Sequence, residues 1–147
     1  MGTLKGLAKR MHAEADAIEN IANDAAVWFA KYLVAELIKE TPVDTSRALS
    51  NWLIAFGAPS NMGTIDFVPG IHGSTEGTNT AAAILRAHTA LDAKIPGEVI
   101  YISNVVRYIV YLNRGTSGQA PALYVENAIL RAKVTLRTKI EAGGFRK

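Results

Sequence analysis

The fold is decided by one stretch of the sequence, Thr41-Pro42-Val43-Asp44-Thr45-Ser46-Arg47-Ala48-Leu49-Ser50-Asn51-Trp52. A helical pattern precedes it and a strand-like pattern follows it. Thr41 and Pro42 end the helix, because the residue before a proline is disfavoured in the α region. The side chains that follow can bond nearby backbone groups, which favours a turn or a cap; they are Asp44, Thr45 and Ser46.

The second half of the stretch carries more chemistry than a plain connector needs. It adds a guanidinium, an amide and an indole, on Arg47, Asn51 and Trp52. Over residues 50–57 the side chains alternate between two apolar faces, one of which holds Trp52, Ile54 and Phe56. Because both faces are apolar, we expect a strand that is covered on both sides.

Upstream, residues 8–40 form a helical pattern without proline or glycine. Its apolar residues recur three and four positions apart: Ala15, Ile18, Ala22, Ala25, Trp28 or Phe29, Tyr32, Ala35 and Ile38. One amphipathic helix of this length would measure roughly 45 Å, which is longer than a compact domain of this size needs. We expect it to project toward, or pack against, a neighbouring subunit. This single helix could be frayed or bent near residues 20–24. The alternative is two shorter helices on a monomer.

Downstream, residues 58–79 hold four glycines and two prolines, with a brief apolar run at residues 65–68. We expect this segment to form a mobile loop, which could be a hairpin. Thr80 could cap a second helix that ends near Lys94. Its expected apolar stripe is Ala81, Ile84, Leu85, His88 and Leu91. A strand is predicted over residues 98–104, and residues 105–113 fit a helix or a strand.

The last part of the chain predicts a loop over residues 114–121 and a closing helix, with Pro121 in its first turn. The buried face of this helix is expected to hold Tyr124, Val125, Ala128, Ile129, Ala132 and Leu136. The sequence therefore predicts one α+β domain over residues 1–147. It contains a long N-terminal helix, an antiparallel or mixed sheet, and further helices packed on the sheet, including a C-terminal helix. The ends, residues 1–7 and 143–147, are expected to be loose.

Composition limits the functional classes. Apolar residues make up 49% of the chain and charged residues 20%, which suits a folded core, and the formal net charge is only +3. There is no cysteine, which excludes a disulfide framework, a thiolate metal site and a cysteine nucleophile in these residues. No segment approaches the roughly 18 apolar residues of a membrane span, and no signal-peptide pattern begins the chain. We expect a protein that is made and used in the cytoplasm.

The residues show no pattern typical of catalysis or of a bound cofactor or metal. His12 is expected to be solvated and His88 to be a half-buried packing residue, whereas His72 lies in a plausible site loop without a second ligand at metal-binding spacing. No nucleophile elbow or phosphate loop is present. We therefore expect no enzyme activity and no cofactor. A small hydrolase that uses His72 with an acidic partner is the least favoured hypothesis.

The closing helix suggests a second hypothesis, a DNA-binding accessory protein that uses a basic C-terminal helix. Its cations lie on several faces rather than on one stripe, and no aromatic ladder accompanies them; they are Arg131, Lys133, Arg137 and Lys139. A solvated helix end, where cations suit the helix dipole, explains them better.

Two stretches together carry a resemblance to a known family. The first is residues 41–52, followed by Gly57-Ala58-Pro59. The second begins with Tyr101-Ile102-Ser103-Asn104 and Tyr108 and continues as Leu112-Asn113-Arg114-Gly115-Thr116-Ser117 and Gln119-Ala120-Pro121. In this order they resemble the small tailed-phage neck and tail-completion proteins, also described as minor tail or head–tail joining proteins. The resemblance covers roughly residues 25–137.

The resemblance implies a structural role in the virion, without catalytic residues or a cofactor. Such proteins sit between the capsid portal complex and the tail, and are assembled in the host cytoplasm. They form homo-oligomeric rings, here expected to be hexamers. The partners would be the chain itself and neighbouring neck, tail-terminator or tail-tube proteins. Genomic DNA would pass through the ring without specific binding, and no membrane would be involved.

The chain departs from the family pattern at two positions. Ser46 stands where the family usually has glycine, so this turn is expected to avoid a positive φ or to tolerate a small side chain. Asn113 stands where glutamate is common, which removes a charge that could pair with an arginine such as Arg47. The candidate residues for a fold joint or a subunit interface are Asp44, Arg47, Asn51, Trp52, Tyr108, Asn113, Arg114, Gly115, Ser117, Gln119 and Pro121.

Two interpretations of these candidates stay open. In the first interpretation the candidates determine the fold. Asp44 caps or turns the exit of the long helix, and Trp52 fills the core and finds a partner for its indole N–H. Tyr108 packs near the loop at residues 115–117, and residues 119–121 start the last helix. In the second, Arg47, Asn113, Arg114 and the loop at 115–121 form the contact between subunits of a ring. We further expect residues 58–79 to contact a neighbour or the tail tube on assembly.

Overall fold

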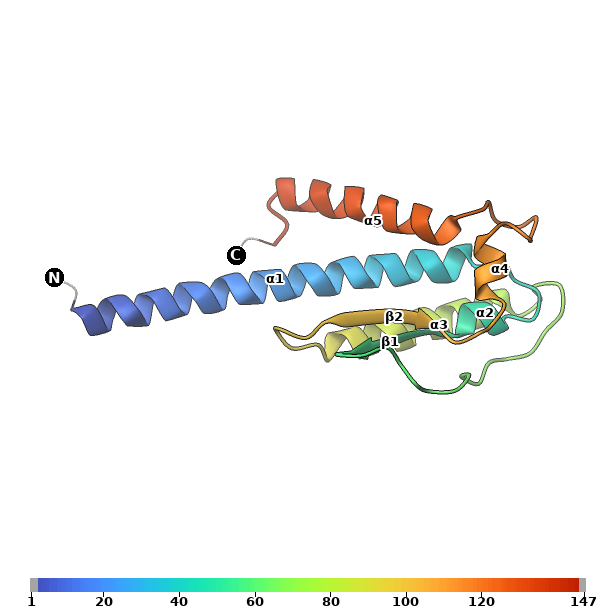
Figure 1. The fold of residues 1–147 in the computed structure, drawn as a ribbon, viewed down its shortest axis with the longest axis horizontal. Helices are drawn as coiled ribbons and strands as arrows, with labels where there is room; N and C mark the ends of the chain where they lie inside the picture. Colours follow the sequence, from blue (N-terminus) through green and yellow to red (C-terminus); the bar gives the residue numbers. More distant parts are fainter. Residues whose placement is uncertain (1–2, 146–147) are drawn as a thin grey trace.

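The computed structural model describes residues 3–145, and its longest element, helix α1 (Leu4–Glu40), runs along most of the molecule (Figure 1). At 1.5 Å per residue its 37 residues extend about 56 Å. The prediction of one long helix is confirmed, and the alternative of two shorter helices is wrong. The helix begins before residue 8 because the Thr3 hydroxyl accepts a hydrogen bond from the Gly6 amide at 3.0 Å. Leu4–Leu7 therefore belong to α1, and residues 1 and 2 lie outside the described part, so the expected looseness of the N-terminal end stays a prediction.

The remaining elements confirm the α+β class. They are α2 (Arg47–Ser50), β1 (Trp52–Phe56), α3 (Glu76–Asp92), β2 (Ile100–Asn104), α4 (Ile109–Asn113) and α5 (Tyr124–Glu141). Strands β1 and β2 pair antiparallel, from Trp52 opposite Asn104 to Phe56 opposite Ile100. The expected strand was too long at its start, because Ser50 ends a short helix and only Trp52 begins β1.

The core surrounds the second half of α1. Figure 1 shows α5 on one side of this helix and the two-stranded sheet with α3 on the other. The core contains α1 residues such as Val34 and Ile38, Leu49 and Trp52 from the segment after α1, and alanines from α3 and α5. Small side chains let two helices approach closely, so α1 packs against both α3 and α5.

The two outer helices bury partly different residues than expected. In α5, Tyr124, Ala128 and Ala132 are fully buried, as predicted, and Leu136 is half-buried. In α3 the buried residues are Asn79, Ala83, Ala87 and Leu91. The expected place of Leu85 on the buried stripe is wrong, since its side chain is 69% exposed. Packing against α1 selects the narrow row of small residues four apart, and Leu85 lies away from it.

Two predicted helix starts are wrong. Thr80 lies inside α3, which begins at Glu76, four residues earlier. Pro121 precedes α5 by three residues, because Leu123 adopts a left-handed conformation with φ 62° and the helix begins at Tyr124. Residues 119–121 therefore do not start the last helix. Residues 105–113 resolve into a turn followed by the short helix α4.

The segment between β1 and α3 is irregular over residues 58–70 and turns over residues 71–75. The suggested hairpin within residues 58–79 is wrong, since the structure contains no strand there, and residues 76–79 belong to α3. At the C-terminus, the Phe145 ring packs edge-on against Trp28 with centroids 6.1 Å apart. Residues 146 and 147 lie outside the described part, and the expected looseness of this end stays a prediction.

No helix within residues 3–145 combines the length and the apolar character that crossing a membrane requires.

Candidate functional site: the joint between residues 41–52 and 108–121

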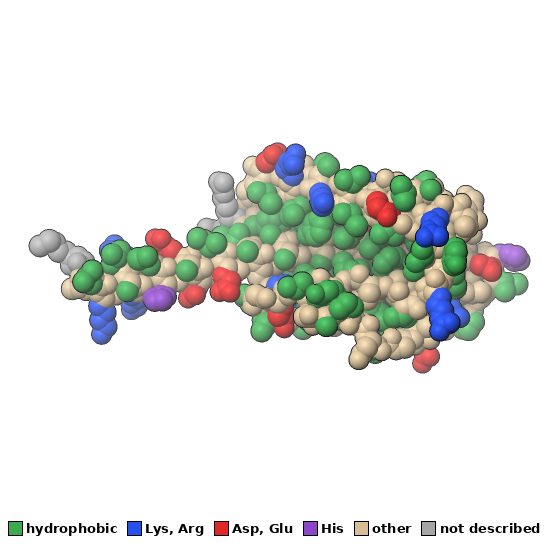
Figure 2. All heavy atoms as spheres, in the orientation of Figure 1, with side chains coloured by type: hydrophobic (Ala, Val, Ile, Leu, Met, Phe, Trp, Pro, Cys, Tyr) green, Lys and Arg blue, Asp and Glu red, His purple; other side chains and the backbone are tan. Residues whose placement is uncertain are grey.

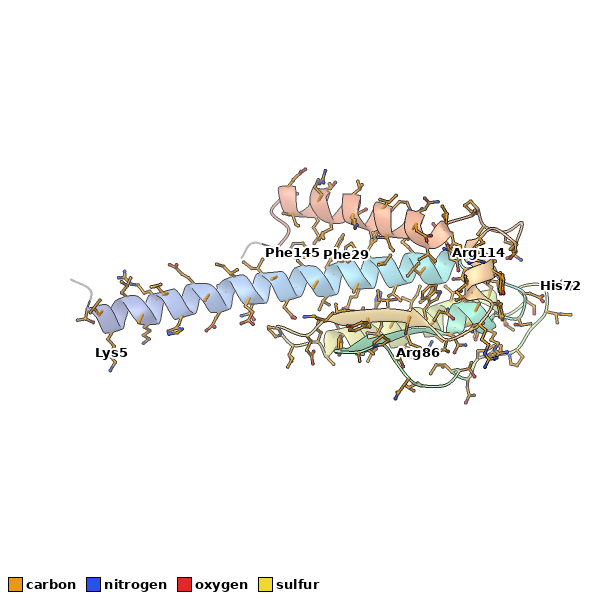
Figure 3. The ribbon with its side chains drawn as sticks, in the orientation of Figure 1. Lys5, Phe29, His72, Arg86, Arg114 and Phe145 are labelled. Atoms are coloured by element: carbon orange, nitrogen blue, oxygen red, sulfur yellow. The ribbon has the colours of Figure 1, made fainter. Side chains whose placement is uncertain are left out.

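The structure brings the two motif stretches together at one end of the molecule. Helices α2 and α4 both lie at the end opposite the N-terminus (Figure 1), and residues of both line one hollow. Arg114, just after α4, and His72, in the turn before α3, lie at the same end (Figure 3). We call the contact between residues 41–52 and residues 108–121 the joint.

One glutamine side chain links the two stretches directly. The Gln119 Oε1 accepts a hydrogen bond from the Val43 amide at 2.7 Å, and its Nε2 donates one to the Val43 carbonyl at 2.9 Å. The Gln119 side-chain amide thereby satisfies both the backbone N–H and the backbone carbonyl of Val43. Val43 is buried and lies in a segment without secondary structure. Buried backbone groups need such partners. Gln119 therefore holds the exit of α1 against the loop after α4.

Five of the candidate residues line one hollow beside this link. The hollow has a volume of about 370 Å³. Its walls include Asp44, Arg47, Tyr108, Ser117 and Gln119. The remaining candidates lie outside this hollow, in the core beneath it or in the loop that leads to α5.

Trp52 anchors the joint to the core. Its side chain is 6% exposed, and its indole Nε1 donates to the Thr41 hydroxyl at 2.8 Å. The same hydroxyl donates to the Leu37 carbonyl at 2.6 Å, near the end of α1. The prediction that Trp52 fills the core and finds a partner for its N–H is confirmed. Thr41 is that partner, and it also closes the last turn of α1.

Ser46 overturns one expectation. Its φ of 71° is left-handed, so the expectation that serine avoids a positive φ here is wrong. The position instead tolerates a small side chain: Ser46 is buried, and its hydroxyl lies 3.1 Å from the Thr75 hydroxyl. This contact explains why Thr75, which precedes α3, makes no side-chain cap on that helix. A left-handed residue costs free energy outside glycine, and the contacts around Ser46 compensate for it.

Asp44 holds the long segment rather than capping α1. Its Oδ1 accepts a hydrogen bond from the His72 amide at 2.7 Å, and its carbonyl accepts one from the Gly73 amide at 2.9 Å. The last turn of α1 is instead closed by the Thr41 backbone amide. The Asp44 side chain thus turns the chain at the exit of α1, as predicted, but the expected cap is wrong.

Two asparagines continue this pattern of amide contacts. Asn51 is fully buried; its Nδ2 donates to the Arg47 carbonyl and its Oδ1 accepts from the Ile65 amide, both at 2.7 Å. Asn79 accepts from the Val68 amide and donates to the Val68 carbonyl, both at 2.9 Å. Asn79 therefore holds Val68 in the same way that Gln119 holds Val43.

Sequence reasoning missed three residues outside the joint that hold it or the segments next to it. Besides Asn79, they are Asn104, whose Nδ2 donates to the Ala48 carbonyl at 2.9 Å, and Arg86, which donates to the Ser50 carbonyl. One signal pointed to Asn79: asparagine is a poor residue for a helix interior, so its place on the buried row of α3 suggests a polar contact. Asn104 ends a predicted strand, and no local pattern identified Arg86.

Because side chains hold the Ile65 and Val68 amides, the part of this segment that we expect to be mobile is residues 58–64. We expect hydrogen exchange in the free protein to be at least about tenfold slower at the Ile65 and Val68 amides than at residues 58–64, where the one described hydrogen bond is local, from the Met62 amide to the Ser60 hydroxyl. Asn79→Ala should remove the protection of Val68 and leave that of Ile65. Equal protection across residues 58–68 would contradict this.

Asn113 makes its side-chain contacts at the start of α5 rather than with Arg47. Its Oδ1 accepts from the Val125 amide at 2.9 Å, and its Nδ2 donates to the Glu126 carboxylate at 2.8 Å. Helix α5 lacks a side-chain cap from its own N-cap residue, so Asn113 serves its first turn from outside the helix.

The loop after α4 depends on Gly115 and Ser117. Gly115 has φ 86°, and a Cβ there would lie 3.0 Å from the Ala122 Cβ, so the position requires glycine. The Ser117 hydroxyl accepts from the Gln119 amide at 3.2 Å, which orients the glutamine.

The remaining candidates face outward. The Arg47 side chain is exposed and makes no hydrogen bond or ion pair within residues 3–145. Tyr108 lines the hollow beside it; burial raises the pKa of the Tyr108 hydroxyl, which the Arg47 charge opposes and the Asp44 charge reinforces. Arg114 lies 6.0 Å from the centre of the exposed Tyr111 ring. Arginine and tyrosine thus gather on the outer surface of the joint.

The histidines lie largely where expected. His12 is exposed, and His88 is half-buried with its Nε2 3.2 Å from the Lys31 carbonyl. His72 is exposed, and its Nδ1 lies 4.0 Å from the Asp44 carboxylate. No cluster of three or more metal-ligating side chains occurs among the residues that the structure describes.

Two of the four cations of α5 are engaged within the fold. Arg131 pairs with Glu40 and lies 3.6 Å from Glu36, both on α1. The Lys139 Nζ lies 5.2 Å from the Trp28 ring centre. This helix therefore presents fewer free cations than its sequence suggests.

No known protein-family model, curated protein or solved structure matches this chain.

Proposed function

We propose that this chain is a virion structural protein of the neck or tail-completion region of a tailed phage, where it forms a ring subunit that joins head and tail around the DNA channel. One observation supports the proposal most. The two stretches that carry the family resemblance are 76 positions apart at Val43 and Gln119, yet this pair holds them in one joint. Two stretches that meet in one surface can serve together as one assembly contact.

The outer surface of the joint has the composition of a subunit contact. Arginine and tyrosine are enriched at the energetic centres of protein interfaces. Here Arg47 and Arg114 are exposed, and Tyr108 and Tyr111 lie beside them. Since the Arg47 side chain makes no hydrogen bond or ion pair with residues 3–145, it is available to a neighbour.

A ring needs a head-to-tail contact, in which the joint of one subunit meets a different surface of the next. In this proposal the partners are further copies of the chain and the neighbouring neck, tail-terminator or tail-tube proteins. DNA passes through the ring without specific binding, and the protein is found in the virion after assembly in the host cytoplasm.

Substitution of the two outward arginines tests the subunit contact. We expect Arg47→Ala with Arg114→Ala to lower the incorporation of the chain into particles at least tenfold, because loss of one central interface arginine costs about thirtyfold in association. The measurement is quantitative blotting of purified particles, after complementation of a phage that lacks the gene. The melting temperature should stay unchanged, since neither guanidinium holds the fold.

The matched control is Arg137→Ala, which removes an exposed cation from α5. Its incorporation should equal that of the unmodified chain. If the double variant is incorporated normally, or if it loses incorporation only together with thermal stability, Arg47 and Arg114 do not form the subunit contact.

A further inference from the structure

The first half of α1 carries an apolar stripe whose large side chains are left exposed by the residues that the structure describes, 3–145. This half projects beyond the body of the molecule as a single helix (Figures 1 and 2). Its stripe follows alternating steps of four and three, the spacing of a coiled-coil seam, and consists of Leu4, Ala8, Met11, Ala15, Ile18 and Ala22. The large members are well exposed: Leu4 by 86%, Met11 by 61% and Ile18 by 68%.

The stripe leads into an apolar hollow where the projecting helix meets the body. This hollow has a volume of about 270 Å³. One wall is α1, with Ile18, Ile21 and Ala22, and the other is the end of the chain, with Ile140 and Phe145. An isolated helix with such a surface would leave apolar area in water that a partner could bury.

The charges of the projecting half are separated along its length. Cations lie near the tip, at Lys5, Lys9 and Arg10, and carboxylates lie nearer the body, at Glu14, Asp16 and Glu19. Figure 2 shows the two groups in this order along the projecting helix. A second copy aligned in parallel would place like charges side by side, whereas an antiparallel copy would place cations against carboxylates.

The sizes of the stripe residues select the same direction. In an antiparallel pair centred on residue 13, Leu4 faces Ala22, Ile18 faces Ala8 and Met11 faces Ala15. Every layer then combines one large side chain with one alanine, which fills space evenly. A parallel pair would stack leucine on leucine and alanine on alanine, leaving crowded layers next to empty ones.

The flanking positions agree with this register. Lys5 of each copy lies beside Glu19 of the other, so the dimer contains two Lys5–Glu19 ion pairs. Leu7 of each copy lies beside Ile21 of the other, and it therefore enters the apolar hollow. One like-charge contact opposes the pairing, because Glu14 of one copy lies beside Glu14 of the other. Arg10, one turn away on the same helix, offsets this repulsion.

We propose that the projecting half of α1 binds a second copy of this chain as an antiparallel helix pair over residues 4–22, with Leu4 and Leu7 of each copy seated in the hollow formed by residues 18–25 and the C-terminal end of the other. The pair would be about 28 Å long. It lies at the opposite end of the molecule from the joint (Figure 1), so both surfaces can be occupied at once. The proposal does not depend on the ring.

Cross-linking tests the pairing and its direction. Because the sequence contains no native cysteine, only the introduced cysteines react. The full chain is used as single variants His12→Cys, Lys5→Cys and Glu19→Cys, treated with a short bismaleimide. His12→Cys should form a covalent dimer, because the two copies of residue 12 flank the centre. Lys5→Cys alone should not, since its two copies lie about 24 Å apart along the pair. A mixture of Lys5→Cys and Glu19→Cys should cross-link between the two variants.

Substitution within the stripe provides the second measurement. Met11→Glu should weaken self-association about a hundredfold in sedimentation velocity, because each pair would bury two carboxylates against alanine. Ala13→Glu is the control: it adds the same charge on the opposite side of the helix and should leave self-association unchanged. Efficient cross-linking of Lys5→Cys to itself would show a parallel arrangement. Absence of any dimer, by cross-linking or sedimentation, would refute the pairing.

Discussion

Trp52→Ala is expected to lower the free energy of unfolding by about 3–5 kcal/mol, the usual range for removing a buried aromatic side chain. The side chain is part of the core cluster shared by α1, α3 and α5. Its loss would open a cavity below the joint and leave the Thr41 hydroxyl without its donor. The measurement is urea denaturation followed by far-ultraviolet circular dichroism, which does not rely on tryptophan fluorescence.

Two control variants separate the contributions. Trp52→Phe keeps most of the apolar volume and removes the indole N–H, so it should cost about 1 kcal/mol for the hydrogen bond plus a smaller packing loss. Trp28→Ala makes the original substitution at a half-buried site that contacts Tyr32 and Phe145. It should cost clearly less than Trp52→Ala. Equal losses at the two tryptophans would contradict a core centred on Trp52.

Gln119→Glu is expected to cost about 2–3 kcal/mol although it changes hardly any atom positions. A carboxylate still accepts from the Val43 amide, but it has no donor for the Val43 carbonyl and places two oxygens against each other. An unsatisfied buried carbonyl alone costs about 1–3 kcal/mol. The same denaturation experiment measures this loss.

Asn61→Asp is the matched control for Gln119→Glu. Asn61 is an exposed amide in the irregular segment, and the same chemical change there should alter stability by less than about 0.5 kcal/mol. If Gln119→Glu is as mild as Asn61→Asp, the glutamine does not hold the joint and the link between the two stretches lies elsewhere.

Local patterns were sufficient where a structure depends on neighbours in sequence. The apolar spacing of residues 8–40 identified α1, and alternation identified β1 and β2. The helix stop at Thr41-Pro42 also followed from a local steric rule. The predicted starts at Thr80 and Pro121 failed because distant contacts decide them. Thr75 bonds Ser46 rather than its own helix, and Asn113 serves the first turn of α5.

The contacts within the joint were out of reach of sequence reasoning for the same reason. Gln119 was identified as a candidate, but its partner Val43 is 76 positions away, and an apolar residue gives no sign that its backbone needs a side chain. The strain at Ser46 was also invisible, because only the buried contact with Thr75 shows how a non-glycine residue is held at positive φ. The Arg47 side chain is exposed in the structure, and which of the two interpretations applies to it stays a prediction that the Arg47→Ala and Arg114→Ala variant tests.

Localisation of the chain in intact particles tests the central claim most directly. The measurement is immunogold electron microscopy of purified virions that carry an epitope tag on this chain. We predict label at the junction of head and tail, and a ring of density there that is lost in particles made without the chain. Purified particles without label, or label spread over the capsid surface, would contradict the account.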